Sequence, residues 1–281
     1  MPNYTEADIE WPEYFIILTK KIETMLIYDS PGKKDHYYET STKAEDKSFE
    51  DAIKEKTMVM IEKIDELQQK LYAEKTRSLL IVFQGPDGSG KDSLTRRVLG
   101  PLNPQGVEVT CFKAPEPEDL AHDYLWRIHK RVPTKGQIGV FNRSHYEDVL
   151  VVRVKKFAPE KVWKKRYDHI NNFENMLSDS GTTILKFFLH ISKKEQLQRF
   201  EDRKNDPDKN WKYNPDDLEF QELWNNYRDA YQDVFEKCGT KFAPWYIIPA
   251  DNKWYRDYCV AKTILKTLED MNPKFPVKKF D

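Results

Sequence analysis

The stretch Gly85–Ser93 constrains this chain most, because it reads Gly-Pro-Asp-Gly-Ser-Gly-Lys-Asp-Ser directly after the apolar run 78–84. This is the pattern G-x-x-x-x-G-K of a phosphate-binding loop, placed between an expected strand and an expected helix. Glycine allows the positive φ angles that turn successive backbone N–H groups toward one phosphate. The following helix directs its positive end at the same anion. We expect phosphate or nucleotide contacts from Gly85, Gly88, Ser89, Gly90, Lys91, Asp92 and Ser93.

One position in the loop departs from the usual pattern. Asp92 stands where a Ser or Thr hydroxyl would reach Mg²⁺, and Ser93 follows it. A carboxylate oxygen is a good ligand for Mg²⁺, so metal binding survives this exchange. The alternative is an ordinary glycine-rich turn. Against that alternative, the whole chain has only ten Gly, and three of them cluster here behind an apolar strand.

Composition excludes several classes of protein. The 281 residues are 39% hydrophobic and 33% charged with a net charge of −1, which indicates a soluble globular chain and gives no general sign of nucleic-acid binding. No apolar run approaches the ~20 residues of a membrane helix, and the N-terminus lacks a signal-peptide pattern. Three Cys without a C-x-x-C pair argue against a disulfide framework and a zinc site. We therefore expect a cytoplasmic protein that binds neither nucleic acid nor membrane.

The order of elements predicts the fold class. We expect strands at 79–83, 107–112, 138–141, 183–191 and 245–248. We expect helices at 48–72, 91–99, 118–132, from about 144, 163–177, 193–204, 221–236 and 254–271. Strands separated by helices predict an α/β three-layer sandwich with a five-stranded parallel sheet. Ser48 and Asp51 resemble a capping box, so we place the domain at 48–281 and an N-terminal extension at 1–47.

Two basic segments follow the loop. Residues 125–166 carry twelve Lys or Arg against three acidic residues, which is typical either of a solvated helix face or of a polyanion-binding surface. Residues 193–220 have the composition of a kinase lid, although a mobile charged loop would look the same. Arg199 and Arg203 lie four residues apart on an expected helix, so both can face one side. Lid closure would bring their guanidinium groups onto a transferred phosphoryl group.

Other positions narrow the class of phosphate-loop protein. The chain lacks the Asn-Lys-x-Asp with which GTPases read guanine. Asn142 follows the third expected strand, where motor and transport ATPases carry an acid. Small-molecule and nucleotide kinases remain.

Several blocks together resemble the polyphosphate kinase 2 family. They include Gln84-Gly-Pro-Asp-Gly-Ser-Gly-Lys-Asp92 and Gly139-Val-Phe-Asn-Arg-Ser-His-Tyr-Glu147, with further blocks at 112–115, 122–130, 186–190, 210–212 and 249–254. The resemblance implies a thymidylate-kinase-like P-loop fold with a helical lid. It also implies reversible transfer of the terminal phosphoryl group of inorganic polyphosphate to AMP and ADP. The segment Asn142-Arg143-Ser144-His145-Tyr146 resembles the branch whose members accept both nucleoside mono- and diphosphates, whereas other branches carry Asp at position 142.

The resemblance and the residue chemistry together suggest roles for the site. The expected catalytic residues are Asp87, Lys91, Arg143, Arg199 and Arg203. Further phosphate or nucleotide contacts are expected from Asn142, Lys113, Arg127, Lys130 and Arg131. Asp87, Asp92 and Glu147 are the expected ligands of Mg²⁺, or of Mn²⁺ in its place. As alternatives, Asp87 only stabilises the turn, and Glu147 only complements a positive helix N-terminus.

The expected partners follow from these roles. They are inorganic polyphosphate, AMP, ADP and ATP, with guanine nucleotides as further candidates. The resemblance also implies a second copy of the chain as a partner, because members of that family are commonly dimers or tetramers. We expect direct in-line transfer without a phosphohistidine. Two other functions fit the residues alone: a conventional nucleotide kinase that uses ATP, and a non-catalytic polyanion-binding protein.

Overall fold

One six-stranded sheet forms the centre of the molecule in a computed structural model, which describes residues 27–277 except 31, 34 and 213–220. The strands are β1 (Ile27–Tyr28), β2 (Ser78–Gln84), β3 (Val107–Cys111), β4 (Ile138–Asn142), β5 (Thr182–His190) and β6 (Trp245–Pro249). Their order across the sheet is β1-β6-β5-β2-β4-β3. Strands β2 to β6 pair in parallel, as expected for strands separated by helices.

The expectation of five strands is wrong by one, because β1 adds a sixth at the sheet edge. It pairs antiparallel with β6 through Ile27↔Tyr246 and Tyr28↔Trp245. A two-residue strand is too short to show an alternating apolar pattern. Its position depends instead on tertiary packing, since the fully buried Tyr28 ring lies 5.3 Å from that of Phe235.

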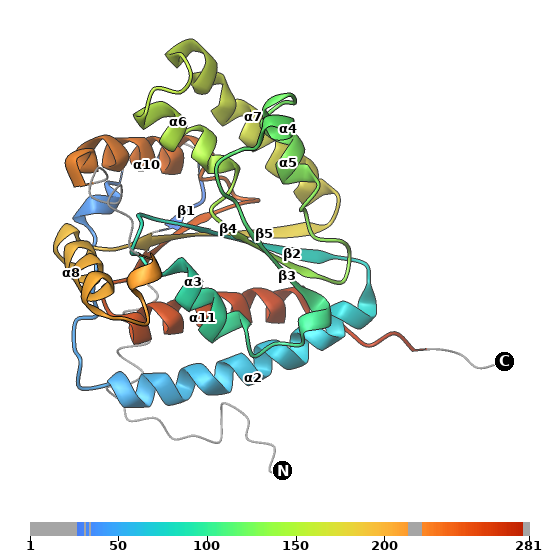
Figure 1. Cartoon of the computed structure of the whole chain (residues 1–281). Helices are drawn as coiled ribbons and strands as arrows, with labels where there is room; N and C mark the ends of the chain where they lie inside the picture. Colours follow the sequence, from blue (N-terminus) through green and yellow to red (C-terminus); the bar gives the residue numbers. More distant parts are fainter. Residues whose placement is uncertain (1–26, 31, 34, 213–220, 278–281) are drawn as a thin grey trace.

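Helices cover both faces of the sheet (Figure 1). The helical elements are η2 (Tyr37–Glu39), α2 (Glu50–Glu74), α3 (Lys91–Leu94), η3 (Thr95–Leu99), η4 (Pro104–Gly106), α4 (Pro117–Leu120), α5 (Trp126–His129), η5 (His145–Asp148), α6 (Val151–Val154), α7 (Glu160–Asp179), α8 (Lys193–Asn205), η6 (Asn210–Lys212), α10 (Trp224–Cys238) and α11 (Lys253–Met271). On one face α2, α3 and α11 enclose a core that includes Ile64 and Ile264. On the other, α7 and α10 enclose a core that includes Ile170 and Val234. The three-layer α/β sandwich is confirmed.

Three expected helices differ in detail. The helix expected at 118–132 is broken into α4 and α5, and the Asp123 side chain accepts from the Leu125 N–H at 3.0 Å in the gap. Such local side-chain bonds compete with helix formation. The helix expected at 91–99 changes to a π-type turn, η3, after Leu94. The helix expected from Ser144 is the short 3₁₀ element η5, in which the Ser144 Oγ accepts from the Tyr146 N–H.

The predicted capping box at Ser48 is wrong. Helix α2 begins at Glu50 after Phe49, which makes no side-chain capping bond, and the Ser48 N–H instead donates to Asp46 Oδ1 at 2.8 Å. A turn centred on Asp46 therefore competes with the cap.

The described part of the expected N-terminal extension lies against the sheet and its helices. The Thr42 hydroxyl donates to Asp251 Oδ2 at 2.7 Å, and the Ala44 N–H donates to Asn252 Oδ1 at 3.0 Å. Residues 1–26 of the extension lie outside the described residues. Among the helices that the structure describes, none combines the length and the apolar character needed to span a bilayer.

Candidate active site

The phosphate loop begins where the fully buried strand β2 ends. Gly85, Gly88 and Gly90 have φ angles of 147°, 83° and 95°, which side chains with a Cβ rarely adopt. A side chain at two of these positions would also crowd its neighbours. A Cβ at Gly90 would lie 2.1 Å from an Arg256 guanidinium nitrogen, and one at Gly88 would lie 3.2 Å from the Phe200 ring. The loop conformation that the glycine pattern predicts is therefore present.

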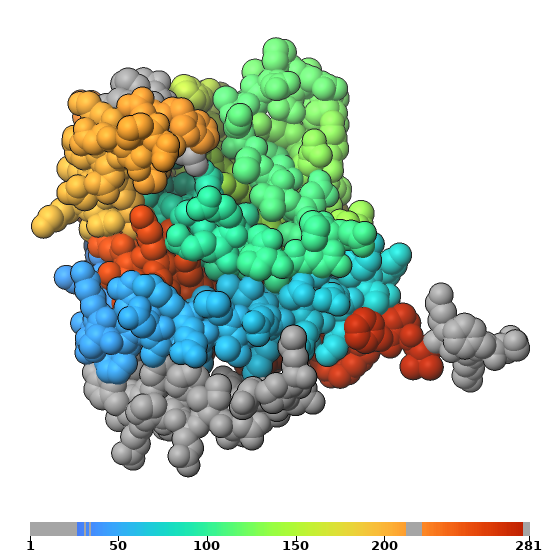
Figure 2. Space-filling view, turned by 60° about the horizontal axis from the view of Figure 1, so that its bottom comes forward, coloured from blue at the N-terminus to red at the C-terminus, as the bar shows by residue number. Residues whose placement is uncertain are grey.

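The loop opens into a hollow on the molecular surface. In Figure 2, α8 (orange) and the segment that carries α4 and α5 (green) stand on either side of this hollow, and the segment of the loop and α3 (teal) lies between them. Arg203 belongs to α8, and Arg127 belongs to α5. A ligand that extends out of the loop would therefore lie between two elements that each carry an arginine.

Three side chains outside the loop bind its carbonyl oxygens, and we call Gln196, Arg199 and Arg256 the collar. Gln196 Nε2 donates to Asp87 O at 2.6 Å. Arg199 donates to the carbonyls of residues 88 and 89 at 2.9 and 3.1 Å. Arg256 donates to those of residues 89 and 90, both at 3.2 Å. The carbonyls of residues 87 to 90 are therefore held in place by side chains from α8 and α11.

Lys91 lies inside the loop, as the pattern predicts. Its Nζ donates to Gly85 O at 2.7 Å and to Pro86 O at 3.2 Å, and the residue is only 7% exposed. Burial lowers the pKa of Lys91, while the Asp87 charge opposes that shift. An ammonium held this way offers its remaining donor to a phosphate in the loop.

Asp87 and Arg143 form an ion pair at the mouth of the loop. Arg143 NH2 lies 2.6 Å from Asp87 Oδ1, and the two side chains are 41% and 37% exposed. Although burial of Asp87 acts in the other direction, the charges of Lys91 and Arg143 lower the pKa of its carboxyl. Arg143 has a φ of 60°, a conformation that costs a non-glycine residue free energy, and its N–H donates to Phe83 O. The strained backbone turns Arg143 toward the loop.

Glu147 faces the same charges. Its carboxyl interacts with the charges of Arg143, Lys91 and Asp87, and burial raises its pKa against the pull of the two cations. The alternative role, as complement to a helix dipole, is weakened because η5 has only four residues. The structure therefore places Glu147 near the loop, where its carboxylate can take the place of the acid that is missing at Asn142.

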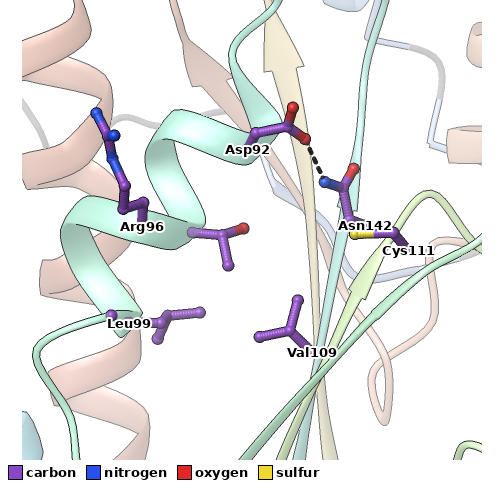
Figure 3. Close-up of a pocket in the computed structure, with 8 residues that line it drawn as sticks. Asp92, Arg96, Leu99, Val109, Cys111 and Asn142 are labelled. Atoms are coloured by element: carbon purple, nitrogen blue, oxygen red, sulfur yellow. Dashed lines mark hydrogen bonds between the residues drawn. The ribbon is translucent and has the colours of Figure 1, made fainter.

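Asp92 and Asn142 contact each other across the sheet edge. Asn142 Nδ2 donates to Asp92 Oδ1 at 2.7 Å, so the amide is on the strand and the acid on the helix (Figure 3). The pair borders a cleft of about 340 Å³ whose other lining residues are Thr95, Arg96, Leu99, Gly100, Val109 and Cys111. Figure 3 shows the apolar walls of this cleft beneath the pair, between α3–η3 and β3. Cys111 is its exposed thiol, whereas Cys238 and Cys259 are buried.

The two lid arginines occupy different positions on α8. Arg199 uses all five N–H donors: Nε bonds Glu195, NH1 bonds the loop carbonyls, and NH2 bonds the carbonyls of Ala250 and Asp251 at 2.7 and 2.9 Å. The Arg203 guanidinium lies 5.6 Å from the centre of the Phe200 ring, and its charge contributes to the lowered pKa of Asp87. The contacts favour Arg203 over Arg199 for a catalytic role, which stays a prediction for both. Residues 213–220 of the expected lid lie outside the described part.

At least six of the twelve basic residues in the run 125–166 are paired with acids. The ion pairs are Arg127–Asp119, Arg131–Glu108, Arg143–Asp87, Arg153–Asp233, Lys164–Glu160 and Arg166–Asp148. Lys130 lies 3.6 Å from the centre of the Trp126 ring, and Arg127 NH1 donates to Lys113 O at 3.0 Å. Part of the run is therefore structural, while Arg127 and Lys113 come together beyond the end of β3.

A metal site would need oxygen ligands from the substrate. No group of three or more His, Cys, Asp or Glu among the described residues is arranged to hold a metal ion. Mg²⁺ in kinases commonly uses one or two carboxylates together with substrate phosphates. One or two of Asp87, Asp92 and Glu147 fit that donor set, since the charges of all three act on Lys91 in the loop.

The collar residues Gln196 and Arg256 were not predicted from the sequence. Arg256 falls on the inward face of α11 between apolar residues and is fully buried. A buried guanidinium at apolar spacing requires acceptors nearby, and that signal could have identified it. Gln196 carries no such signal, because a glutamine on a polar helix is ordinary.

A profile of the family described as polyphosphate kinase 2 matches residues 47–276. The chain belongs to the polyphosphate kinase 2 family. An AMP/ADP-polyphosphate phosphotransferase from Meiothermus ruber is 50% identical over 218 residues, which cover 78% of this chain and 82% of that protein. An ADP-polyphosphate phosphotransferase from Rhodopseudomonas palustris is 40% identical over 258 residues, or 88% and 86% of the two chains. A crystal structure of polyphosphate kinase 2 from Arthrobacter aurescens TC1 matches with a TM-score of 0.86 and 39% identity, covering 89% and 90%.

Proposed function

We propose that this polyphosphate kinase transfers the terminal phosphoryl group of inorganic polyphosphate to AMP and ADP, giving ADP and ATP. The observation that carries the proposal is that Lys91 lies inside the phosphate loop while the ion pair of Asp87 and Arg143 lies at its mouth. The similarity to an AMP/ADP-polyphosphate phosphotransferase supports both acceptors. Nucleotide analysis after mixing protein, Mg²⁺, long-chain polyphosphate and AMP tests it: ADP followed by ATP is expected, and unchanged AMP would contradict it.

The loop residues suit direct, reversible in-line transfer, which needs alignment and neutralised charge more than a covalent nucleophile. Two of the three Lys91 donors bind loop carbonyls, and we assign the third to a phosphoryl oxygen. Arg143, oriented by Asp87, stabilises charge that develops on the same group. We propose Asp87, Asp92 and Glu147 as the holders of Mg²⁺ or Mn²⁺, which neutralises charge on the phosphate oxygens when bound.

The basic surface suits the proposed donor. Polyphosphate carries roughly one negative charge per phosphate, as a nucleic-acid backbone does. We propose that Lys113, Arg127, Lys130 and Arg131 contact its chain or the nucleotide, with Arg127 positioned by its bond to Lys113 O. Guanine nucleotides are further candidate acceptors.

The salt dependence of the Michaelis constant tests this basic surface. We expect the KM for long-chain polyphosphate to rise steeply with ionic strength, and that for short chains to rise less, because long chains contact more cations. Steady-state kinetics between about 50 and 200 mM salt measure this. Equal salt dependence for short and long donors would mean that the run is only a solvated, internally paired face.

Matched substitutions distinguish the roles of the two lid arginines. Arg203→Lys keeps the charge but loses the planar fork, and we expect kcat to fall at least about tenfold with little change in the KM for the acceptor. Arg199→Lys removes several bonds to loop carbonyls, and we expect it to lower the Tm by about 4 °C or more. A normal kcat in Arg203→Lys, together with an unchanged Tm in Arg199→Lys, would contradict both assignments.

The proposal extends to the domain bounds, the cellular location and the oligomeric state. We propose residues 48–281 as the catalytic domain, 1–47 as an extension and 193–220 as the lid. We also propose a cytoplasmic homo-oligomer, a dimer or a tetramer. Sedimentation of the full chain tests the oligomer, because a monomer at all concentrations would contradict it.

A further inference from the structure

A fully buried polar cluster lies behind the active site. It consists of Glu174 of α7, Lys186 of β5, and His145 and Tyr146 of η5, all with no exposed surface. Lys186 Nζ lies 2.6 Å from Glu174 Oε2 and donates to the Tyr146 hydroxyl at 2.7 Å and to Cys238 O at 2.8 Å. Glu174 Oε1 accepts from the Tyr146 hydroxyl at 2.8 Å and lies 3.2 Å from His145 Nε2. Every donor of the ammonium is therefore satisfied.

The cluster holds the segment that presents Arg143 and Glu147 to the loop. His145 and Tyr146 contact Glu174 within the cluster, while their neighbour Ser144 accepts from Gln84 Nε2 at 3.1 Å. The side chains of Ser144, His145 and Tyr146 thus lie in the interior. Arg143 and Glu147, which flank them in the sequence, face Lys91 and Asp87. Arg143 itself has a strained backbone, with φ at 60°, which only a fixed surrounding structure maintains.

Stability alone is a weak explanation for this cluster. Burying two charges costs desolvation free energy, and replacing a buried ion pair with apolar residues is often neutral or stabilising. Removing one partner is costly, because the other charge is then buried alone. A buried network of this kind is better suited to fixing one geometry, since its bonds are directional.

We propose that Glu174 is a positioning residue for phosphoryl transfer. It holds His145 and Tyr146 through one carboxylate oxygen, and Lys186 fixes that carboxylate to β5. The geometry directs Arg143 and Glu147 to the phosphate loop, so Glu174 acts on the reaction only through them. This inference rests on the proposed function, and wild-type turnover is therefore measured first: no turnover refutes the function, whereas the variants below test positioning.

The test separates fold from positioning by removing the whole ion pair. Glu174→Leu/Lys186→Met leaves no buried charge unpaired, but the Tyr146 hydroxyl, His145 Nε2 and Cys238 O lose partners. We therefore expect a folded protein with a lowered Tm. We expect its kcat to fall at least about tenfold while the KM for polyphosphate stays within a factor of about two, because the misplaced Arg143 and Glu147 act on the reacting group. If this variant does not fold, Tyr146→Phe removes one hydroxyl of the cluster, and a smaller loss of kcat with unchanged KM is expected.

The coupling between Glu174 and Arg143 decides whether Glu174 is a positioning residue. If Glu174 acts through Arg143, adding Glu174→Leu/Lys186→Met to Arg143→Ala should lower kcat little further. The effects of the two changes on Tm should be additive. Asp233→Asn, which breaks an ion pair with Arg153 between α6 and α10, serves as control and should leave kcat unchanged. A normal kcat in the folded cluster variant, or losses of kcat that add fully to Arg143→Ala, would overturn the proposal.

Discussion

Replacing Lys91 by alanine is expected to lower kcat by at least about 10²-fold, the cost of losing a charge aimed at the transferred phosphoryl group. Lys91 provides that charge from inside the loop, where its Nζ also binds Gly85 O and Pro86 O. Steady-state rates with polyphosphate and AMP measure the loss. The KM values should change less than kcat, because the missing contact strengthens in the transition state.

A matched control excludes a general effect of removing a lysine. Lys266 lies on the exposed side of α11, with a side chain 68% exposed, so Lys266→Ala should keep normal turnover. Thermal unfolding of Lys91→Ala shows whether the loop carbonyls needed the ammonium for folding. A folded Lys91→Ala protein with more than a tenth of wild-type turnover would refute its catalytic assignment.

The substitution Glu147→Gln is expected to lower turnover by about 10²-fold and to raise the Mg²⁺ concentration needed for half-maximal rate. Burial raises the pKa of Glu147 in the free protein. Folding thus favours the protonated carboxyl, and this stabilisation is lost as the pH rises through the raised pKa. The Tm of Glu147→Gln at neutral pH should therefore equal or exceed that of the wild type, although its activity is lost.

The same reasoning gives the pH dependence of the wild-type enzyme. Below the raised pKa, Glu147 is protonated and cannot bind a metal ion, so the apparent affinity for Mg²⁺ should fall with decreasing pH.

Asn142→Asp in the Glu147→Gln background should restore part of the activity, since residue 142 lies beside Asp92. A near-normal Mg²⁺ titration in Glu147→Gln would leave Asp87 and Asp92 as the main acidic groups at the metal.

Much of the site could be predicted because it depends on local sequence. The phosphate loop needs glycines at fixed spacing between a strand and a helix, and the structure has positive φ angles at Gly85, Gly88 and Gly90. The parallel sheet follows from alternating strands and helices, since parallel neighbours need crossover connections. The carboxyl ends of β2 and β4 then meet, because Phe83 pairs with Asn142.

The remaining features depend on contacts between residues distant in sequence. The bonds from Arg199 and Arg256 to the loop carbonyls span 111 and 167 positions, and local patterns do not encode such contacts. Strand β1 is too short to show a period, and its edge position comes from packing against α10. In the gap between α4 and α5, a bond from Leu125 to Asp123 overrides an otherwise helical pattern.

The choice of phosphoryl donor tests the central claim most directly. The purified full chain is supplied with Mg²⁺, AMP and either long-chain polyphosphate or ATP as the sole donor, and kcat/KM is measured for each from the nucleotides formed. We predict that kcat/KM for polyphosphate exceeds that for ATP by at least about tenfold, because a cationic surface beyond β3 contacts a long anionic chain and a short triphosphate gains less from it. Equal or greater kcat/KM with ATP would contradict this and indicate a conventional nucleotide kinase, and binding of polyphosphate without any turnover would contradict it equally.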